Sequence, residues 1–182
     1  MHLRLDLSLS VTSQDRLVDT SQRLGARLGS TFVDGRINPR FGTCNITLPL
    51  QNGHYLEVVC PLNHPSSDST PFGKAVSQRT AEGGGWLTWV VAVDDVSKIE
   101  KRLGRATVDG HRIKPDGKAI LKIVKIEITG TKSLIEEWFG SELRAAIGLD
   151  VEVEWVAESG NDGDSGMVSV HVMTPSGVVR LD

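Results

Sequence analysis

One carboxylate interrupts an otherwise apolar stretch, Tyr55-Leu-Glu-Val-Val59. A charged side chain on an apolar surface costs several kcal/mol of folding free energy unless it is paired, hydrogen-bonded, ligated or protonated. Glu57 therefore needs a partner, and three kinds of partner fit the sequence. It can pair with Arg36 or Arg40 from the preceding loop, face a small ligand in a water-filled cavity, or bind a metal ion.

The residues around this carboxylate read as a β-hairpin. Asn52-Gly53 is typical of a two-residue turn, and it separates apolar stretches at about 44–50 and 54–60. Such a turn sets Leu48 opposite Glu57, on the more apolar face of the hairpin. We therefore expect the carboxylate to lie among aliphatic side chains.

The same register separates other side chains of the hairpin that could do chemistry. It places Asn45 on the face opposite to Glu57, and it puts Cys44 and Cys60 on opposite faces, which argues against a disulfide between them. Neither thiol lies at a predicted helix N-terminus or beside an obvious base. We expect both cysteines to pack as small apolar side chains.

A set of polar and aromatic residues could bind a small organic molecule together with the carboxylate. The polar groups would orient the molecule and the rings would supply an apolar wall, although a tryptophan in a strand is also typical of a core. The candidate ligand-binding residues are Arg36, Arg40, Asn45, Tyr55, Glu57, Trp86 and Trp89. If the chain is an enzyme, Glu57 is the candidate catalytic residue.

Metal chemistry has less support from the residues. The five histidines show no paired spacing, and Glu57 by itself would not supply the several protein ligands that a tight metal site requires. We expect no metal or other cofactor, and a divalent metal bound through Glu57 is the alternative.

The elements that position these residues belong to a globular chain. Its 182 residues are 39% hydrophobic, enough for a core of ordinary size. The 20 Lys and Arg are scattered among 23 Asp and Glu, which argues against a nucleic-acid partner. No apolar run approaches the roughly 20 residues of a membrane helix. The N-terminal stretch MHLRLDLSLS alternates rather than forming a signal-peptide core, so we expect a cytoplasmic protein with no membrane partner.

A strand, a polar cap, a helix and a glycine recur three times along the chain. Alternating leucines predict a strand at 3–11, and the helix after it is expected to end at Gly29. The same unit returns at 86–104 and at 120–140, each time ending on a glycine. Three strands follow the first and third helices, whereas only one short strand, at about 106–113, follows the second. The pattern predicts two βαβββ modules with a truncated module between them.

These units divide the chain into four parts. They are a first βαβββ module at 1–60, a connector at 61–85, a truncated βαβ module at 86–118 and a last βαβββ module at 119–182. The connector is expected to carry one short helix, capped by Thr70 with Pro71 at its first position. Its Gly83-Gly84-Gly85 run precedes a strand instead of opening a helix, so we interpret it as a hinge rather than a phosphate loop.

The order of three segments resembles a known family. The modules contain, in this order, GRINPRFGTCNITLPLQNGHYLEVV, HPSSDSTPFGKAV and GGGWLTWVVAVDD. This order is similar to that of the bacterial glyoxalase-like proteins of the vicinal oxygen chelate superfamily, closely from about Leu5 to Lys118 and more loosely from Ile120 to the end. The resemblance implies an α+β fold in which repeated βαβββ modules form curled, half-open barrel sheets, with helices packed on the outside and a cavity enclosed by two modules.

The resemblance also implies where a metal would bind. In metal enzymes of this superfamily the ligands come from the first strand of each module, usually histidine, and from a glutamate late in the meander. Glu57 matches that glutamate. Leu7, however, stands where relatives carry the first-strand histidine, and Asn38 stands where they often carry a histidine in the loop.

Three hypotheses about function follow. The first is a protein that binds a small organic molecule in a sheet cavity without a complete metal site. The second is a metal-dependent lyase, isomerase or dioxygenase of the same superfamily that uses Glu57. The third is a dimerisation or interaction scaffold, in which a homodimer completes the sheet edge that the truncated module leaves open.

Overall fold

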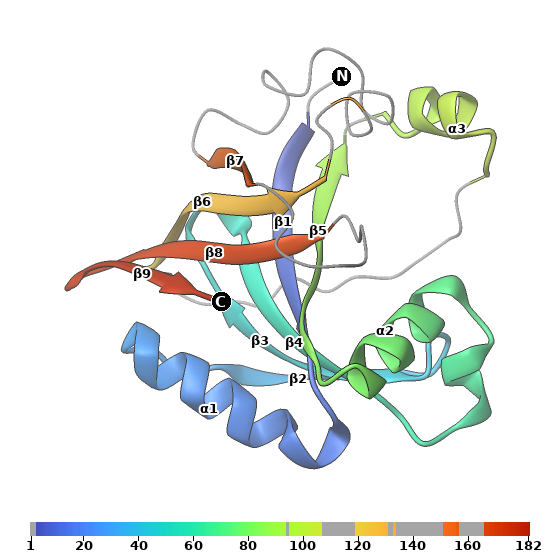
Figure 1. The fold of residues 1–182 in the computed structure, drawn as a ribbon, viewed down its shortest axis with the longest axis horizontal. Helices are drawn as coiled ribbons and strands as arrows, with labels where there is room; N and C mark the ends of the chain where they lie inside the picture. The colour runs from blue at the N-terminus through green and yellow to red at the C-terminus, as the bar shows by residue number, and fades with distance from the viewer. Residues whose placement is uncertain (1–2, 94, 107–118, 131–132, 134–150, 157–165) are drawn as a thin grey trace.

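Two β-sheets and three α-helices make up the described part of the protein (Figure 1). A computed structural model describes residues 3–93, 95–106, 119–130, 133, 151–156 and 166–182. The first sheet has the order β2-β3-β4-β1-β5 and consists of β1 (Leu3–Val11), β2 (Val33–Asn38), β3 (Thr43–Pro49), β4 (Tyr55–Pro61) and β5 (Gly85–Val93). The second has the order β7-β6-β8-β9 and consists of β6 (Lys122–Thr129), β7 (Glu152–Val156), β8 (Met167–Thr174) and β9 (Gly177–Leu181).

The first sheet contains the strand, helix and three-strand meander expected from the sequence. β2, β3 and β4 are antiparallel neighbours, and β4 returns beside β1 in the same direction. The helix between β1 and the meander is α1 (Leu17–Leu28), which follows the short 3₁₀ helix η1 (Gln14–Arg16). β5 adds to the free side of β1 as an antiparallel strand, so the first and middle units of the chain share one sheet.

The expected helix ends are confirmed where the structure describes them. Gly29 follows α1 with φ 63° and Gly104 follows α3 (Ser97–Leu103) with φ 61°, the left-handed conformation that glycine adopts without steric cost. In α2 (Pro71–Ala81), the Thr70 hydroxyl accepts a 3.1 Å hydrogen bond from Gly73 N–H, and Pro71 opens the helix. The third predicted helix and the strand at about 106–113 lie outside the described residues.

The glycine run before β5 is a tight turn. Gly83, Gly84 and Gly85 all have positive φ, between 82° and 102°. A Cβ on Gly84 would lie 2.6 Å from the backbone carbonyl oxygen of Val11. Glycine is therefore required here by close packing against β1 as well as by backbone conformation.

The second sheet is not a spatial copy of the first. Its strands follow one another along the chain as expected, but β6 lies between β7, to which it is parallel, and β8, to which it is antiparallel. In the first sheet the corresponding strand β1 lies beyond the whole meander. The fold is mixed α+β with two open sheets, and the described strands close no barrel.

One apolar core joins the two sheets. The strands of the second sheet run across those of the first in Figure 1, and β5 contacts β8. The buried side chains of this core are Leu28, Leu48, Leu50, Leu56, Trp86, Leu121, Ile123, Ile126, Ile128, Val151, Met167, Val170, Val172 and Leu181. Because α1 packs on the same face of the first sheet and also reaches β9, this face is covered by both the helix and the second sheet.

A smaller cluster covers the opposite face of the first sheet. Val11, Tyr55 and Val59 pack there against Val76 of α2, with Phe72 at the edge. α2 follows the 3₁₀ helix η3 (Pro65–Asp68) and contacts β4, β5 and β1. The first sheet therefore lies between α2 on one side and α1 with the second sheet on the other.

The hairpin register predicted from Asn52-Gly53 is wrong by one residue. Leu50 N–H donates to the His54 carbonyl at 2.8 Å, so the loop has three residues and forms the 3₁₀ turn η2 (Gln51–Gly53). Thr47, not Leu48, lies opposite Glu57. Since side chains alternate between faces, a shift of one residue exchanges the residues that share a face with the carboxylate.

Candidate functional site

Glu57 is buried in the middle of β4, on the α2 side of the first sheet. The whole residue is 6% exposed, and its backbone neighbours are Thr47 of β3 and Leu9 of β1. Tyr55, two residues earlier on the same strand and the same face, is 2% exposed. The carboxylate thus lies inside the sheet, where an uncompensated charge would be costly.

Asn45 supplies a hydrogen bond to this carboxylate. Its Nδ2 donates to Glu57 Oε1 at 2.7 Å, and its Oδ1 accepts the backbone N–H of Arg36 at 2.6 Å. Because the two ends of the amide serve opposite roles, the backbone of β2 fixes which end of Asn45 points at Glu57. The register predicted from Asn52-Gly53 places these two residues on opposite faces, whereas the observed register puts them on the same face.

A bulge in β2 makes this arrangement possible. The pairing of β2 with β3 shifts between Asp34 and Ile37, so that two residues of β2, Gly35 and Arg36, lie opposite the single residue Asn45 of β3. A Cβ on Gly35 would collide with the carbonyl oxygen and the side-chain oxygen of Asn45. Gly35 therefore makes room for the amide, and the bulge turns the Arg36 N–H toward it.

The two predicted arginines lie in β2 and in the loop that follows it. Arg36 takes part through its backbone, and its side chain is exposed. Arg40, in the loop after β2, is also exposed. Arg36, Asn45, Tyr55 and Glu57 thus belong to one region on β2, β3 and β4.

The two predicted tryptophans lie on the other face of the sheet. Ser10 of β1 is the backbone partner of both Val58 and Trp86, and Ser8 is the partner of both Leu56 and Trp89. Residues that pair directly share a face, so both indoles face the core between the sheets. The Trp86 Nε1–H donates to the Leu181 carbonyl at 3.2 Å, which ties β5 to the end of β9. The structure therefore does not bring Trp86 and Trp89 together with Glu57.

The cysteines also change their relation with the corrected register. Cys44 and Cys60 are direct backbone partners across β3 and β4, whereas the predicted register put them on opposite faces. Both are free thiols. Burial, followed by a hydrogen bond with Cys44, raises the pKa of the Cys60 thiol to about 12. Cys60 therefore stays protonated at neutral pH and packs as an apolar side chain.

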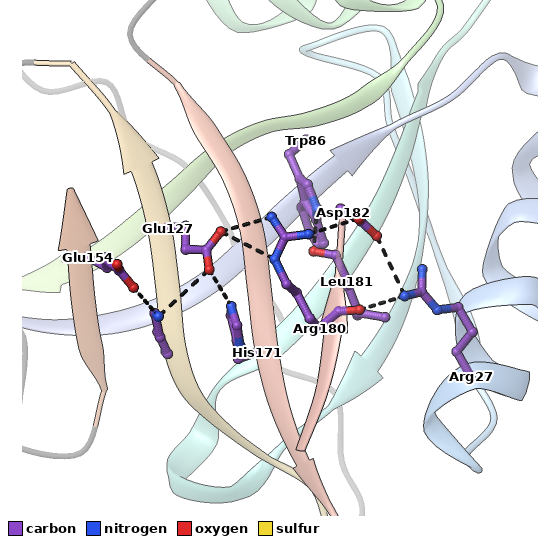
Figure 2. Close-up of polar contacts among 9 residues, drawn as sticks. Arg27, Trp86, Glu127, Glu154, His171, Arg180, Leu181 and Asp182 are labelled. Atoms are coloured by element: carbon purple, nitrogen blue, oxygen red, sulfur yellow. Dashed lines mark hydrogen bonds and ion pairs between the residues drawn. The ribbon is translucent and has the colours of Figure 1, made fainter. Parts of the chain in front are cut away.

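A second polar cluster, not found by the sequence analysis, lies on the second sheet (Figure 2). Its centre is Glu127 of β6, whose side chain is 12% exposed. Oε2 accepts hydrogen bonds from Arg180 Nη2 at 2.9 Å and Nε at 3.3 Å, and Oε1 lies 2.7 Å from His171 Nε2. Lys125 Nζ lies 3.7 Å from Oε1 and also pairs with Glu154.

The basic neighbours of the central carboxylate favour its ionised form. The Arg180 guanidinium is the main cause that lowers the pKa of Glu127 to about 2. In return, Glu127 raises the pKa of Arg180, and Glu154 raises the pKa of Lys125. A carboxylate with so low a pKa is a poor proton donor or acceptor near neutral pH, so Glu127 acts as a clamp between β6, β8 and β9.

The cluster also connects the sheet to the first helix. Arg27 of α1 donates through Nη2 to the Arg180 carbonyl at 2.5 Å and lies 3.6 Å from Asp182 Oδ1.

The sequence contains one signal of this cluster, the opposite charges of Lys125 and Glu127 within KIVKIEIT. Side chains two residues apart in a strand share a face, so these two charges are expected to lie side by side. Their partners on β8 and β9 depend on strand pairing that this signal does not contain.

A known protein family matches most of this chain. A family model described as glyoxalase-like domain matches residues 9–176. The chain belongs to the glyoxalase-like domain family. No curated protein and no solved structure matches this glyoxalase-like chain. The family is therefore established, and the ligand and reaction are not given by any relative.

The residues around Glu57 do not fit the metal site that the superfamily implies. Leu7, the backbone partner of Tyr55 on β1, has no atom that can bind a metal where a histidine ligand would be needed. Among the described residues, no three His, Cys, Asp or Glu side chains lie close enough together to hold an ion. One carboxylate oxygen is also hydrogen-bonded by an amide. A complete metal site at Glu57 is thus not built by the described residues.

None of the described helices is long and apolar enough to cross a membrane.

Proposed function

We propose that this glyoxalase-like protein binds a small organic molecule at the Glu57 face of its first sheet. The observation that carries the proposal is the oriented amide beside a buried carboxylate, Asn45 Nδ2 to Glu57 Oε1 at 2.7 Å. A chain that needed only an apolar sheet could replace both groups with aliphatic side chains at little cost in stability. Instead, the bulge in β2 and Gly35 hold the Asn45 side chain in one direction.

The chemistry of the site favours ligands that carry hydrogen-bond donors. Carboxyl oxygens accept hydrogen bonds, so hydroxyl and amino groups are natural partners for Glu57. The buried ring of Tyr55 lies on the same face and provides apolar contact area. We therefore expect small hydroxylated or amino compounds to bind in preference to apolar compounds without donors. The proposal is for binding, and it includes no reaction.

Ligand-observed NMR with a panel of small compounds tests this proposal. The panel contains hydroxycarbonyl compounds, small carboxylates, primary amines and apolar controls without donors. Binding is compared between the unaltered protein and Glu57→Gln, which keeps the shape of the side chain and removes its charge. Glu82→Gln at the end of α2 is the matched control, because Glu82 is an exposed carboxylate in a loose pair with Arg79.

The expected result is that one or more donor-bearing compounds bind the unaltered protein and Glu82→Gln, and that Glu57→Gln binds them about tenfold more weakly or worse, as the loss of a charged hydrogen bond implies. Equal binding by Glu57→Gln would remove Glu57 from the site. Metal that co-purifies in stoichiometric amount and is lost in Glu57→Gln would instead support the metal-dependent alternative.

A further inference from the structure

A recess lies where two parallel strands end. β1 and β4 run side by side in the same direction and end at Val11 and Pro61. From there the chain enters η1 on one side and the loop before η3 on the other, with α2 alongside. Connections that diverge from neighbouring parallel strand ends leave a crevice. The recess here is widely open to solvent and measures about 690 Å³, within the range of about 300–1,000 Å³ that is typical of pockets for small organic molecules.

This recess is separate from the Glu57 site. Val59 lies between them on β4 and packs in one fully buried cluster with Val11 and Val76. Neither Glu57 nor Asn45 lines the cavity. An inference about the recess is therefore independent of the function proposed for the Glu57 face.

Several polar side chains of the wall are accessible to solvent and make no hydrogen bond within the described part of the protein. They come from three elements: η1, the β4–η3 segment and α2. Within the described part of the chain, no hydrogen bond is made by the side chains of Gln14, Asn63, Asp68 and Ser77. Two amides, a carboxylate and a hydroxyl thus offer both donors and acceptors around one cavity.

The His64 ring adds one more donor. Its Nδ1 accepts the backbone N–H of Ser66 at 3.1 Å and lies 2.8 Å from the Ser66 hydroxyl. A ring nitrogen that accepts an N–H carries no proton itself, so the neutral imidazole has its proton on Nε2. His64 lines the recess with this N–H as its remaining donor.

The charge of the wall restricts the chemical class of ligand. The wall contains Asp68 and neither lysine nor arginine, so phosphates and carboxylates would meet repulsion without a counter-charge. A single exposed carboxylate holds an organic cation only weakly. Pro61, Leu62 and Pro65 contribute apolar surface beside the polar groups. Mixed donors and acceptors next to aliphatic surface match a neutral ligand that has hydroxyl groups on its rim and C–H groups on its faces.

We propose that this recess binds a neutral polyhydroxylated ring, of the class of monosaccharides and cyclic polyols. The amides and the carboxylate bind its hydroxyl groups, and the proline and leucine side chains pack against its C–H face. The proposal does not depend on the function of the Glu57 face.

Saturation-transfer NMR tests the proposal with defined probes. The polyol probes are D-glucose, D-galactose and myo-inositol, and choline and acetate represent small cations and anions. Asn63→Ala and Ser77→Ala each remove one unused polar group of the wall. Gln78→Ala is the matched control, because Gln78 neighbours Ser77 on α2 but bonds to Glu82 and does not line the recess.

The expected result is saturation transfer to at least one polyol, with a dissociation constant that rises about 2- to 10-fold in each of the two wall variants, the change made by one net hydrogen bond, and stays unchanged in Gln78→Ala. Amide shifts of the unaltered protein on adding that polyol should cluster at residues 62–64 and 77–80, a readout that does not depend on how the variants fold. Transfer only to choline or acetate, transfer to no probe, or shifts that cluster elsewhere would each overturn the proposal.

Discussion

Replacing Glu127 with glutamine removes the negative charge at the centre of the polar cluster on the second sheet. The carboxylate is surrounded by Arg180, His171 and Lys125, and its side chain is 12% exposed. Glutamine keeps the size of the side chain but has one amide group where the carboxylate had an acceptor oxygen. In the variant, Arg180 and Lys125 therefore lie near a neutral group. The NH₂ group of the glutamine also faces an N–H donor of a neighbouring side chain where the carboxylate had an acceptor.

The magnitude follows from the pKa of the carboxyl group. The ordinary value of 4.5 and the value of about 2 in the folded protein differ by an amount worth about 3 kcal/mol, since one pH unit corresponds to about 1.4 kcal/mol. Arg180, the main partner, is 43% exposed, and solvent screening reduces what such a pair contributes. We expect Glu127→Gln to lower the free energy of unfolding by about 1–2 kcal/mol near pH 7.

The pH dependence has a definite sign. The pKa of Glu127 is lower in the folded protein than the ordinary value of 4.5, so the unfolded chain binds the proton more tightly. The stabilisation is present above about pH 4.5 and is lost as the pH falls toward 2. The difference between the unaltered protein and Glu127→Gln should therefore shrink progressively over this range.

Urea unfolding followed by circular dichroism measures this difference near pH 7 and near pH 3. Asp19→Asn is the control, because Asp19 pairs with Arg23 on the surface of α1 with both side chains about two-thirds exposed. Such a surface pair contributes about 0.5 kcal/mol or less. The reasoning is refuted if Glu127→Gln costs no more than Asp19→Asn near pH 7, or if its cost is the same at both pH values.

Three further outcomes are expected. Gly35→Ala should lower the free energy of unfolding by about 1–3 kcal/mol, because its Cβ would collide with Asn45, whereas Gly166→Ala, with open space around it, should cost less than about 1 kcal/mol; thermal unfolding compares the two, and equal costs would contradict the close packing. In the native protein at about pH 8, the half-buried Cys44 thiol should react with an aromatic disulfide reagent, while Cys60, with its pKa raised to about 12, should react only after denaturation; two equally fast thiols would show that Cys60 is accessible. Sedimentation velocity tests the homodimer expected from an open sheet edge, and a strictly monomeric boundary would remove it.

Sequence patterns located the individual elements well. The alternating leucines of β1, the Thr70-Pro71 start of α2 and the glycine after α1 were each expected, and the structure contains them. Each of these features depends on residues within one or two turns of chain, where backbone sterics and local hydrogen bonds decide the conformation. The order of segments also indicated the glyoxalase-like family, which the family match over residues 9–176 confirms.

The pairing of the elements was harder to predict. Asn52-Gly53 is compatible with a two-residue loop and with the observed three-residue loop. The loop length determines which residues of β3 share a face with Glu57: Leu48 in the predicted register, and Thr47 and Asn45 in the observed one. Loop length is decided by how the whole hairpin packs, because a shift of one residue turns each side chain to the other face.

The candidate site was also predictable only in part, for the same reason. The sequence by itself determined that Glu57 is an isolated carboxylate in a strand and that Leu7 cannot serve as a metal ligand. Only the tertiary structure decided that Asn45 binds Glu57, that Trp86 faces the other side of the sheet, and that basic side chains from three strands hold a second carboxylate. Residue type and local conformation are properties of neighbouring residues, whereas strand register and the meeting of sheet faces result from many weak contacts between distant segments, which exist only in the folded chain.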